Sequence, residues 1–404
     1  MKIMRVLTRP NLGGPTKQAV ALWHAHRDQG LRSLLVVGAC SRGEDAIDLA
    51  ATGIPQVAPE QILAGEAVEG FARIDALGRS LRPLRDMAAM RVLRRWIRGW
   101  QPDVLHTHTS KAGWVGRAAA HKERVPVIAH TFHGLVLRDY YPAPVGEAFR
   151  RLEMRAARRA NLLFAVSPSC RAELAELGVA PANKIDVIPP AVPLEKTDTD
   201  KRDDLRLKLG IARDTLVIGF IGRFTGVKRP EIFIEALRHS TDARGLMLGD
   251  GPSRRKLQAS APLNISMLGA RSEASQWLSA MDVLMLPSLR EGCPLVAIEA
   301  FAAGIPVVGF DVPGVRDIAG DWGAAVTIPE SEGAIGLAHA IKNLHGDRDA
   351  YASVVDRSRS GLARFTPARV AAQLAARYRD VLEARIGSKM PHAELSSSYR
   401  LDES

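Results

Sequence analysis

Short apolar runs alternate along this chain with longer segments in which apolar residues recur every three or four positions. The runs have the length and the Val, Ile and Leu content of buried strands, whereas the longer segments have the period of amphipathic helices. Such an alternation predicts a parallel sheet covered by helices. In the first half of the chain the expected strands are Ile3–Leu7, Ser33–Val37, Asp103–His106, Val125–His130, Asn161–Val166 and Lys184–Ile188.

The alternation stops near the middle of the chain and then restarts. A proline pair is followed by a charged stretch, Glu195–Asp204, in which apolar residues nearly vanish, so residues 191–204 are predicted to be a linker. We therefore expect an α/β protein with two facing Rossmann-like domains, residues 1–190 and residues 205–365. The strands of the second domain are expected at Thr215–Ile221, Gly245–Leu248, Asn264–Leu268, Asp282–Leu286 and Pro306–Gly309.

The end of the chain contains one more helical pattern. Its spacing predicts a helix over residues 366–386 with one apolar face to bury. The polar segment 387–404 is expected to be a disordered tail. The apolar positions of this last helix are Val370, Leu374, Tyr378 and Leu382.

Composition and charge narrow the class of protein. The chain has 404 residues, of which 46% are hydrophobic and 25% charged, as in globular proteins. No apolar stretch reaches the roughly 18 to 20 residues that span a bilayer, and three scattered cysteines form no disulfide framework, which indicates a cytoplasmic protein. The net charge of +11 favours a polyanionic partner. Because no nucleic-acid-binding module is recognisable, we expect no nucleic-acid partner.

Arginines gather in one segment, Arg79–Trp100, together with two tryptophans. Basic and aromatic side chains in one helix suit an anionic membrane surface, so a peripheral contact with the membrane is one expectation. A basic helix that merely covers the first sheet fits the pattern equally well. The residues on which the membrane expectation depends are Arg91, Arg94, Arg95, Arg98, Trp96 and Trp100.

In open α/β sheets, ligands bind beyond the carboxyl ends of the strands, and unusual residues follow several of the predicted strands. Gly13 and Gly14 precede a helix, where they allow a close backbone approach and place helix amides toward an anion, although an ordinary tight turn also fits. A full GxGxxG motif is absent, which argues against a dinucleotide-dependent dehydrogenase. His133 is expected at the mouth of the cleft. We expect the other histidines of this region to be satisfied within the fold, namely His106, His108 and His130.

The second domain offers two cations and two carboxylates after its strands. Arg223 and Lys228 follow the first strand of this domain, where a guanidinium and an ammonium group suit a diphosphate. Glu291 lies in a glycine-containing loop after another strand, and Glu299 lies within the apolar helix that follows. A carboxylate in such a helix is stabilised only if it meets hydrogen-bond donors, which ribose or sugar hydroxyls would supply.

Taken in order, these motifs resemble those of the family 4 retaining glycosyltransferases, which have the GT-B fold of two facing Rossmann-like domains. The resemblance covers nearly the whole chain to about Ile386 and depends on the ordered set rather than on any single motif. It departs from the family where Arg229 replaces a usual glycine. The motifs are Gly13-Gly14, His133-Gly134, Gly222-Arg223 with Lys228, Gly249-Asp250-Gly251-Pro252, and Glu291 with Glu299.

The resemblance implies a role for each of these residues. Arg223 and Lys228 would bind the donor diphosphate, and His133 would lie close to the reacting sugar. Glu299 would hold the ribose, and the last helix would cross back onto the first domain. The early glycine loop of Gly13 and Gly14 would lie beneath the phosphates. The donor sugar would be held by Glu291 and by the residues after it, which are Gly292, Cys293, Pro294 and Leu295.

The expected activity is transfer with retention, in which the departing diphosphate accepts the acceptor's proton and neither a protein nucleophile nor a metal or other cofactor is needed. The donor is expected to be a UDP-sugar, with a GDP-sugar as the alternative. The acceptor would be a glycan or a lipid-linked sugar, because segments 108–113 and 130–134 resemble enzymes of bacterial exopolysaccharide and O-antigen synthesis. The DxD-like string Asp198-Thr199-Asp200 is interpreted as a solvated spacer.

Two other functions fit part of this pattern. A nucleotide-sugar 2-epimerase shares the fold and uses histidines and carboxylates near a diphosphate, although the Arg223–Lys228 and Glu291–Glu299 patterns favour transfer. A non-catalytic sugar-nucleotide-binding subunit is a second alternative, which only a measurement of activity distinguishes.

Overall fold

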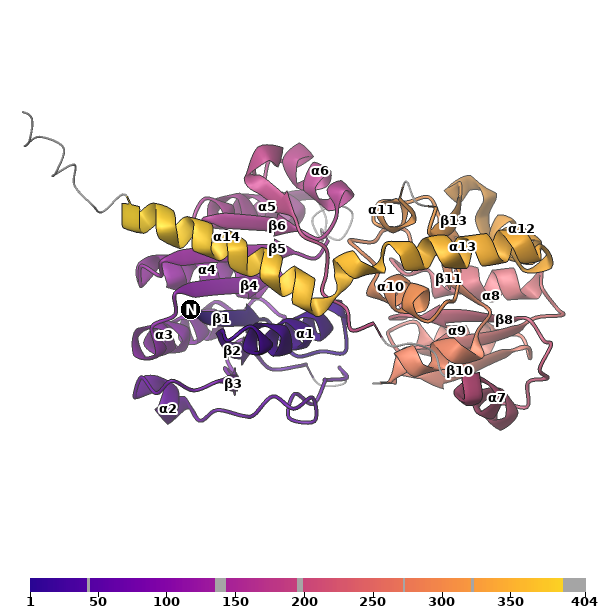
Figure 1. The fold of residues 1–404 in the computed structure, drawn as a ribbon, viewed down its shortest axis with the longest axis horizontal. Helices are drawn as coiled ribbons and strands as arrows, with labels where there is room; N and C mark the ends of the chain where they lie inside the picture. The colour runs from indigo at the N-terminus through magenta and orange to yellow at the C-terminus, as the bar shows by residue number, and fades with distance from the viewer. Residues whose placement is uncertain (42–43, 135–142, 195–198, 272, 321–322, 388–404) are drawn as a thin grey trace, which may run out of the picture.

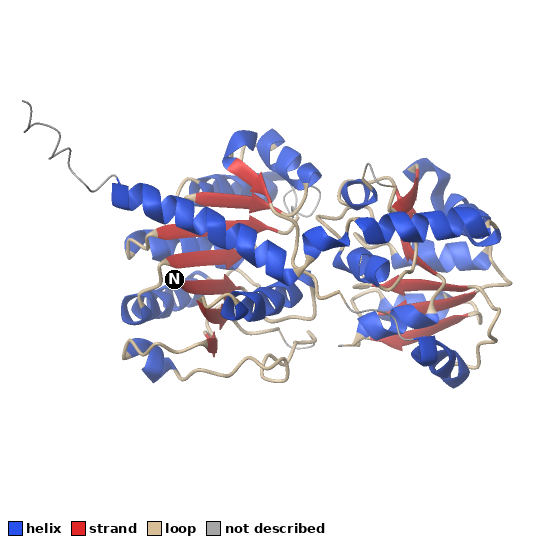
Figure 2. Ribbon diagram, in the orientation of Figure 1, coloured by secondary structure: helices blue, strands red, loops and turns tan. Residues whose placement is uncertain are grey.

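The computed structural model describes residues 1–41, 44–134, 143–194, 199–271, 273–320 and 323–387. It consists of two α/β domains that lie side by side, with the carboxyl ends of the strands of the first domain directed toward the second (Figure 1). Helices lie in front of and behind the strands of each sheet (Figure 2). The expectation of two facing Rossmann-like domains is confirmed.

The first domain contains a parallel sheet of seven strands in the order β3-β2-β1-β4-β5-β6-β7. The reversal of strand order between β1 and β4 creates the crevice in which ligands of such sheets bind. Its strands are β1 (Lys2–Leu7), β2 (Arg32–Val37), β3 (Gly70–Arg73), β4 (Val104–His108), β5 (Val127–Phe132), β6 (Leu162–Ala165) and β7 (Ile185–Val187). Its helices are α1 (Gly14–Asp28), α2 (Pro59–Leu63), α3 (Pro83–Trp100), α4 (Ser110–Lys122), α5 (Ala143–Ala157) and α6 (Pro168–Glu176).

The second domain contains a parallel sheet of six strands in the order β10-β9-β8-β11-β12-β13. Its strands are nearly all apolar because helices cover both faces of a parallel sheet. They are β8 (Val217–Ile221), β9 (Arg244–Leu248), β10 (Ile265–Gly269), β11 (Val283–Leu286), β12 (Val307–Phe310) and β13 (Ala325–Ile328). The helices are α7 (Thr199–Lys208), α8 (Pro230–Arg238), α9 (Arg254–Ser260), α10 (Leu295–Ala302), α11 (Val315–Ala319), α12 (Gly333–Gly346) and α13 (Arg348–Ser360).

Every predicted strand is present, and the two that the pattern did not predict, β3 and β13, are edge strands of four residues. One shift matters for the site. The run Val125–His130 becomes β5, Val127–Phe132, so His130 lies inside the strand and only His133 follows its carboxyl end.

The predicted linker 191–204 is too long, because α7 begins at Thr199. Arg206 of α7 is buried and donates from Nη2 to Asp282 Oδ2 (2.8 Å) and from Nε to the carbonyl of Ala280 (3.1 Å), so this helix packs on the second domain. The charged side chains that gave the segment the composition of a linker include Arg202 and Arg206, which both pair with Asp282 of the second domain. Of the DxD-like string, Asp198 lies outside the described residues and the other two residues begin α7.

The last helix, α14 (Pro367–Gly387), crosses back onto the first domain, as the resemblance implied (Figure 1). Val370, Leu374 and Tyr378 are buried against residues of the first sheet and of α1, including Ile3 and Leu22. The apolar face that the spacing predicted is therefore the contact with the first domain. The predicted disordered tail beyond Gly387 lies outside the described residues.

The tryptophans of α3 do not reach the surface, which corrects the aromatic part of the membrane expectation. Trp96 and Trp100 are 3% and 0% exposed, because residues four apart lie on one helix face and this face packs on the sheet. Arg94 and Arg98 both contact Glu123, at 2.5 and 3.6 Å, and are thereby partly neutralised. The segment covers the sheet, as the alternative interpretation expected.

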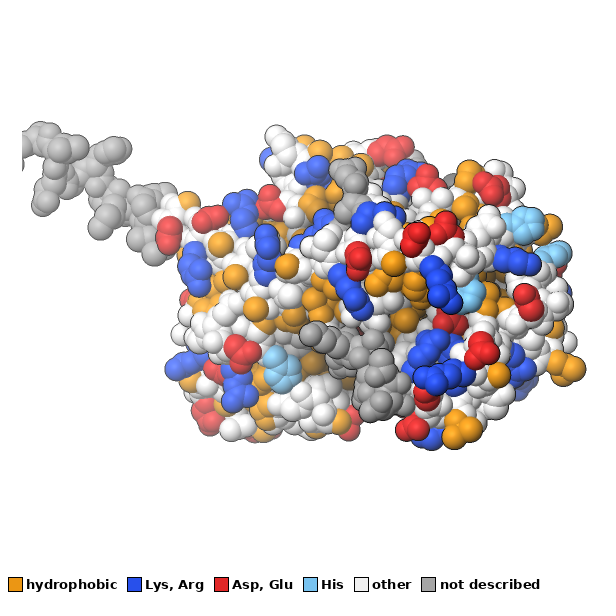
Figure 3. All heavy atoms as spheres, turned by 45° about the vertical axis from the view of Figure 1, so that its right-hand side comes forward, with side chains coloured by type: hydrophobic (Ala, Val, Ile, Leu, Met, Phe, Trp, Pro, Cys, Tyr) orange, Lys and Arg blue, Asp and Glu red, His pale blue; other side chains and the backbone are white. Residues whose placement is uncertain are grey.

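The excess positive charge does not form one continuous patch on the face seen in Figure 3, where Lys and Arg side chains alternate with acidic and hydrophobic ones over both domains. Within the described ranges, no helix combines the length and the apolar character that a bilayer span requires.

Candidate donor-binding site

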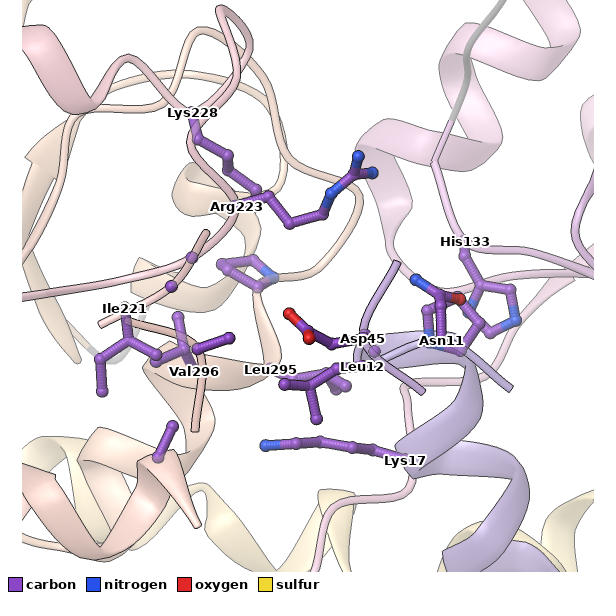
Figure 4. Close-up of a pocket in the computed structure, with 18 of the residues that line it drawn as sticks. Asn11, Leu12, Lys17, Asp45, His133, Ile221, Arg223, Lys228, Leu295 and Val296 are labelled. Atoms are coloured by element: carbon purple, nitrogen blue, oxygen red, sulfur yellow. The ribbon is translucent and has the colours of Figure 1, made fainter. Parts of the chain in front are cut away.

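A cavity of about 650 Å³ lies between the two domains, at the carboxyl ends of their strands. Every site residue predicted from the sequence lines it, and Figure 4 shows Arg223 and Lys228 on one side of it and His133 on the other. The structure therefore brings all the predicted site residues together in one cavity, and the role of each residue stays a prediction. These lining residues are Gly13, Gly14, His133, Arg223, Lys228, Glu291, Gly292, Cys293, Pro294, Leu295 and Glu299.

The early glycine loop allows the first domain to approach helix α10 of the second. Gly13 is the N-cap of α1, and Gly14 is its first helical residue. A Cβ atom on Gly14 would lie 2.9 Å from Cδ1 of Leu295, so with a larger residue here the side chain of Leu295 would have to move. Among the first residues of α1, Pro15 has no amide hydrogen and Thr16 donates to the carbonyl of Gly13 (3.2 Å), so the amide of Gly14 is the donor that this helix end keeps for an anion.

A second close approach brings the His133 segment to the Glu291 loop. A Cβ atom on Gly292 would lie 2.2 Å from the carbonyl oxygen of His133 and 3.0 Å from Cα of Gly134. Gly134 itself has a φ of +123°, which side chains other than hydrogen rarely allow. Backbone therefore meets backbone between the domains, and this contact fixes His133 beside the carboxylate loop.

Of the two predicted cations, Lys228 forms an ion pair with a carboxylate and, among the described residues, Arg223 does not. Lys228 Nζ donates to both carboxylate oxygens of Glu291, at 2.5 and 2.7 Å. Arg223 is exposed to the cavity, and no hydrogen bond or ion pair joins its guanidinium to another residue within the described ranges. Burial lowers the pKa of nearby Arg9; Glu44 opposes this change, and the charges of Arg79 and Arg223 add to it. Positive charge is thus concentrated on this side of the cavity.

Both predicted carboxylates are largely buried and already neutralised. The side chain of Glu291 is 8% exposed and also accepts from Ser288 Oγ (2.7 Å). Glu299 is 10% exposed and accepts from Lys17 Nζ of α1 across the cavity, at 2.7 Å. Lys17 was not among the predicted residues, because no sequence pattern joins positions so far apart in the chain.

Helix α10 directs its N-terminus into the cavity between these carboxylates. Pro294 is the N-cap and has no amide hydrogen, so the donors of this end are the amides of Leu295 and Val296, which no residue of the helix itself can satisfy. Burial raises the pKa of the Cys293 thiol, which keeps it uncharged. The helix end therefore offers neutral amide donors and a partial positive charge.

On the opposite wall, His133 is the front member of a buried polar network. Arg5 of β1 is fully buried, and within the described ranges it pairs with no carboxylate. Its Nη1 contacts Nε2 of His108 at 2.7 Å and Nδ1 of His106 at 3.3 Å. His108 Nδ1 contacts His133 Nε2 at 2.8 Å. A chain of hydrogen bonds thus leads from the core to the cavity.

The direction of these bonds fixes the tautomer of His133. A guanidinium only donates, so His108 accepts at Nε2 and carries its proton on Nδ1. That proton is donated to Nε2 of His133, which leaves His133 with a hydrogen on Nδ1. Burial, and then the positive charge of Arg5, lowers the pKa of His133 to about 3. His133 is therefore neutral at physiological pH and has one N–H to donate.

The C-terminal helix is tied to the same network. The hydroxyl of Tyr378 lies 2.5 Å from Nδ1 of His106, whose Nε2 lies 2.8 Å from Thr131 Oγ1. Nδ1 of His106 also faces Arg5, which can only donate, so this nitrogen carries no hydrogen and accepts from Tyr378. His106 therefore carries its hydrogen on Nε2 and donates it to Thr131. Burial raises the pKa of Tyr378 to about 12, so it stays protonated. The expectation that His106, His108 and His130 are satisfied within the fold holds, but His108 also reaches the site through His133.

Arg229, where the family usually has glycine, has a backbone φ of +47°. This left-handed conformation explains the usual glycine, since other residues adopt it at a cost of about 1 kcal/mol. Here Arg229 Nη1 contacts Glu330 Oε1 at 2.7 Å, an ion pair that offsets part of this strain.

Within the described residues, no group of three His, Cys, Asp or Glu side chains is arranged to hold a metal ion. The groups available to a ligand of this cavity are cations, carboxylates, amides and one imidazole.

Two family models match the chain and meet at this cavity. Residues 13–196 match Glycosyltransferase Family 4, and residues 215–347 match Glycosyl transferases group 1. The HepE protein of Anabaena in complex with UDP and glucose superposes with a TM-score of 0.76 at 20% identity, covering 94% of this chain and all of that one. The fold is therefore that of the GT-B glycosyltransferases. The chain belongs to the family 4 glycosyltransferases.

Individual relatives are about 30% identical to this chain over the region that matches. The UDP-Gal:alpha-D-GlcNAc-diphosphoundecaprenol alpha-1,3-galactosyltransferase of Escherichia coli is 31% identical over 256 residues, which cover 60% of this chain and 66% of the relative. A D-inositol 3-phosphate glycosyltransferase of Nocardia farcinica is 29% identical over 301 residues, or 68% of this chain and 66% of the relative. The matched region thus spans slightly less than two thirds of each relative.

Proposed function

We propose that this protein transfers a sugar, with retention of its anomeric configuration, from a nucleoside diphosphate to a glycan or lipid-linked acceptor. UDP is the proposed nucleotide, and GDP is the alternative. The observation that carries the proposal is the meeting, in one cavity, of an unpaired guanidinium, two buried carboxylates and the N-terminus of a helix. This combination suits a ligand that is a dianion at its centre and bears hydroxyls at both ends.

The donor diphosphate would lie against Arg223 and Lys228. Arg223 could bind phosphate without breaking an ion pair in the described part of the chain. Lys228 would replace part of its contact with Glu291 by contacts with phosphate oxygens. The ribose hydroxyls would donate to Glu299, a largely buried carboxylate whose charged partner is Lys17. The sugar hydroxyls would donate to Glu291 and accept from the first amides of α10.

Catalysis would depend on stabilising the charge that develops on the departing diphosphate. Two preorganised cations and a helix N-terminus supply that stabilisation without a metal ion. The phosphate oxygen on the reacting face would accept the proton of the acceptor hydroxyl, so no protein nucleophile is required. His133 would donate its N–H to a hydroxyl of the transferred sugar and orient it.

The relatives support this choice of substrates. The name of the Escherichia coli relative gives a UDP-sugar donor and a diphosphoundecaprenol acceptor, and the HepE structure contains UDP and glucose. We propose that the reaction belongs to the synthesis of a bacterial cell-surface polysaccharide. We propose also that it takes place in the cytoplasm, with a peripheral contact to the membrane. A nucleotide-sugar 2-epimerase would instead consume the nucleotide-sugar without an acceptor.

A thermal-shift screen against UDP, GDP and their sugars tests the proposal first. A ligand that binds only the folded state raises the melting temperature. The expected result is a clear rise with one nucleotide and its sugars, unchanged by excess EDTA, followed by acceptor-dependent release of that nucleotide. No stabilisation by any nucleotide, or activity that EDTA abolishes and magnesium or manganese restores, would contradict the proposal.

A further inference from the structure

A second cavity, of about 290 Å³, opens beside the donor cavity in the first domain. It is formed by the loops that follow β2 and β3 and by the beginnings of α3 and α4, so it lies on the same ligand-binding edge of the sheet. Arg79 lines both cavities. The two cavities are therefore neighbours that share this side chain.

The second cavity is lined by four cations, Arg79, Arg82, Arg85 and Lys111, and by a single carboxylate, Asp75. Lys111 is buried and neutralised by Asp86, at 2.5 Å. The three arginines keep donors for a ligand. Within the described ranges, the guanidinium of Arg82 has no partner, that of Arg85 donates only to the carbonyl of Asp75 (2.8 Å), and that of Arg79 lies 3.8 Å from Glu44. Several guanidinium groups around one cavity match a phosphate or a diphosphate.

Exposed apolar side chains alternate with these arginines in the sequence, and none of them lines the cavity. Large apolar side chains that reach the solvent are few among the described residues, and three of them lie here: Leu81 is 52% exposed, Leu84 77% and Met87 42%. Leu84 and Met87 are three positions apart on α3 and so lie on one face of the helix. Exposed apolar side chains in the segment that supplies the cavity arginines suit a ligand that has an apolar part as well as an anionic one.

We propose that this second cavity binds the phosphate or diphosphate head of a lipid-linked acceptor, an inference that builds on the proposed glycosyl transfer. Arg79, Arg82 and Arg85 hold the phosphate. Leu81, Leu84 and Met87 contact the first carbons of the lipid chain, and the acceptor sugar extends past Arg79 into the donor cavity.

The test is the binding of farnesyl diphosphate to the full chain saturated with the nucleoside diphosphate that binds it, so that the donor site is occupied. Wild-type protein is expected to bind farnesyl diphosphate without displacing the nucleotide and to bind inorganic diphosphate more weakly. The Arg82→Gln/Arg85→Gln variant should bind farnesyl diphosphate about tenfold more weakly, because charge-assisted hydrogen bonds are lost. Nucleotide affinity should stay unchanged.

The matched control is Arg91→Gln/Arg95→Gln, which removes the same charge from exposed positions of α3 outside the cavity. It should leave farnesyl diphosphate binding within about twofold of wild type, since distant exposed charges are screened. Equal weakening by both variants, equal binding of inorganic and farnesyl diphosphate, or displacement of the nucleotide would each overturn the inference. If no nucleoside diphosphate binds the wild type at all, it is the proposed function that fails.

Discussion

The two walls of the donor cavity use charge in opposite ways. The wall from the second domain presents ionised groups on loops and on a helix end, with Arg223 exposed and Lys228 paired with Glu291. The first domain also lines the cavity with charged residues, among them Lys17 and Arg79, but its His133 network presents one neutral imidazole, and the ionised member of that network, Arg5, is fully buried behind it. The difference indicates a division of labour. The charged groups of the second domain bind and stabilise an anion, and the His133 network orients an uncharged part of the same ligand.

The comparison predicts its largest effect for acid stability. Five histidines of the first domain have lowered pKa values, which burial causes: His26 and His133 to about 3, and His106, His108 and His130 well below 6.5. In the unfolded chain these histidines bind protons below about pH 6.5, whereas in the folded domain they stay neutral. As the pH decreases below about 6.5, the free energy of unfolding should therefore decrease by about 1.4 kcal/mol per pH unit for each histidine involved.

Hydrogen exchange at pH 7.5 and 5.5, corrected for the intrinsic rates, checks this difference by domain. The described histidines of the second domain, His239, His339 and His345, are exposed, so that domain should keep its protection while the first domain loses it. Equal loss in both domains would show that the buried network does not control acid stability.

Removal of a cation from the second wall should have the next largest effect. Arg223→Ala or Lys228→Ala should lower turnover about 10²-fold or more, because each faces the charge that develops on the leaving diphosphate. Arg255→Ala on α9 is the matched control, since Arg255 is exposed and does not line the cavity. Initial rates at saturating donor distinguish the variants. Rates equal to that of the control would remove these residues from the mechanism.

Glu291 should affect turnover more than donor affinity. Glu291→Ala removes the group predicted to hold the transferred sugar, and a misplaced sugar reacts slowly, so we expect a loss of about 10- to 100-fold in turnover. Calorimetric titration with the donor should give nearly the same affinity as for wild type. A large loss of affinity with unchanged turnover would reverse the roles assigned to the two carboxylates.

The smallest of the rate effects should come from behind the first wall. His108→Leu removes the donor to His133 Nε2 and frees the other tautomer, which should lower turnover about tenfold with donor affinity unchanged. His108→Gln can accept from Arg5 and donate to His133, so it should recover part of the loss. Equal rates for the two variants would mean that His108 is only a packing residue.

The sequence predicted most strands of both sheets and four charged residues of the second wall, Arg223, Lys228, Glu291 and Glu299, because these follow a strand or a glycine, whereas Arg271 of the same wall was not predicted. It did not predict the partners that set their states. Lys17 meets Glu299 only after the domains close on each other, and Arg5 meets His108 only after β1 pairs with β4. Edge strands β3 and β13 are too short for their pattern to stand out, and α7 was taken for linker because its charged residues pair with Asp282, far away in the sequence.

A cycle of four calorimetric titrations tests most directly the claim that the cavity holds a nucleoside diphosphate with its ribose on Glu299. UDP and 2′,3′-dideoxy-UDP, or the guanosine pair if GDP binds, are titrated into wild-type protein and Glu299→Gln in the presence of EDTA. We predict that loss of the hydroxyls weakens binding to wild type about tenfold but has little effect on the variant, because the two changes remove one interaction. The same loss in both proteins would place the ribose elsewhere and contradict the account.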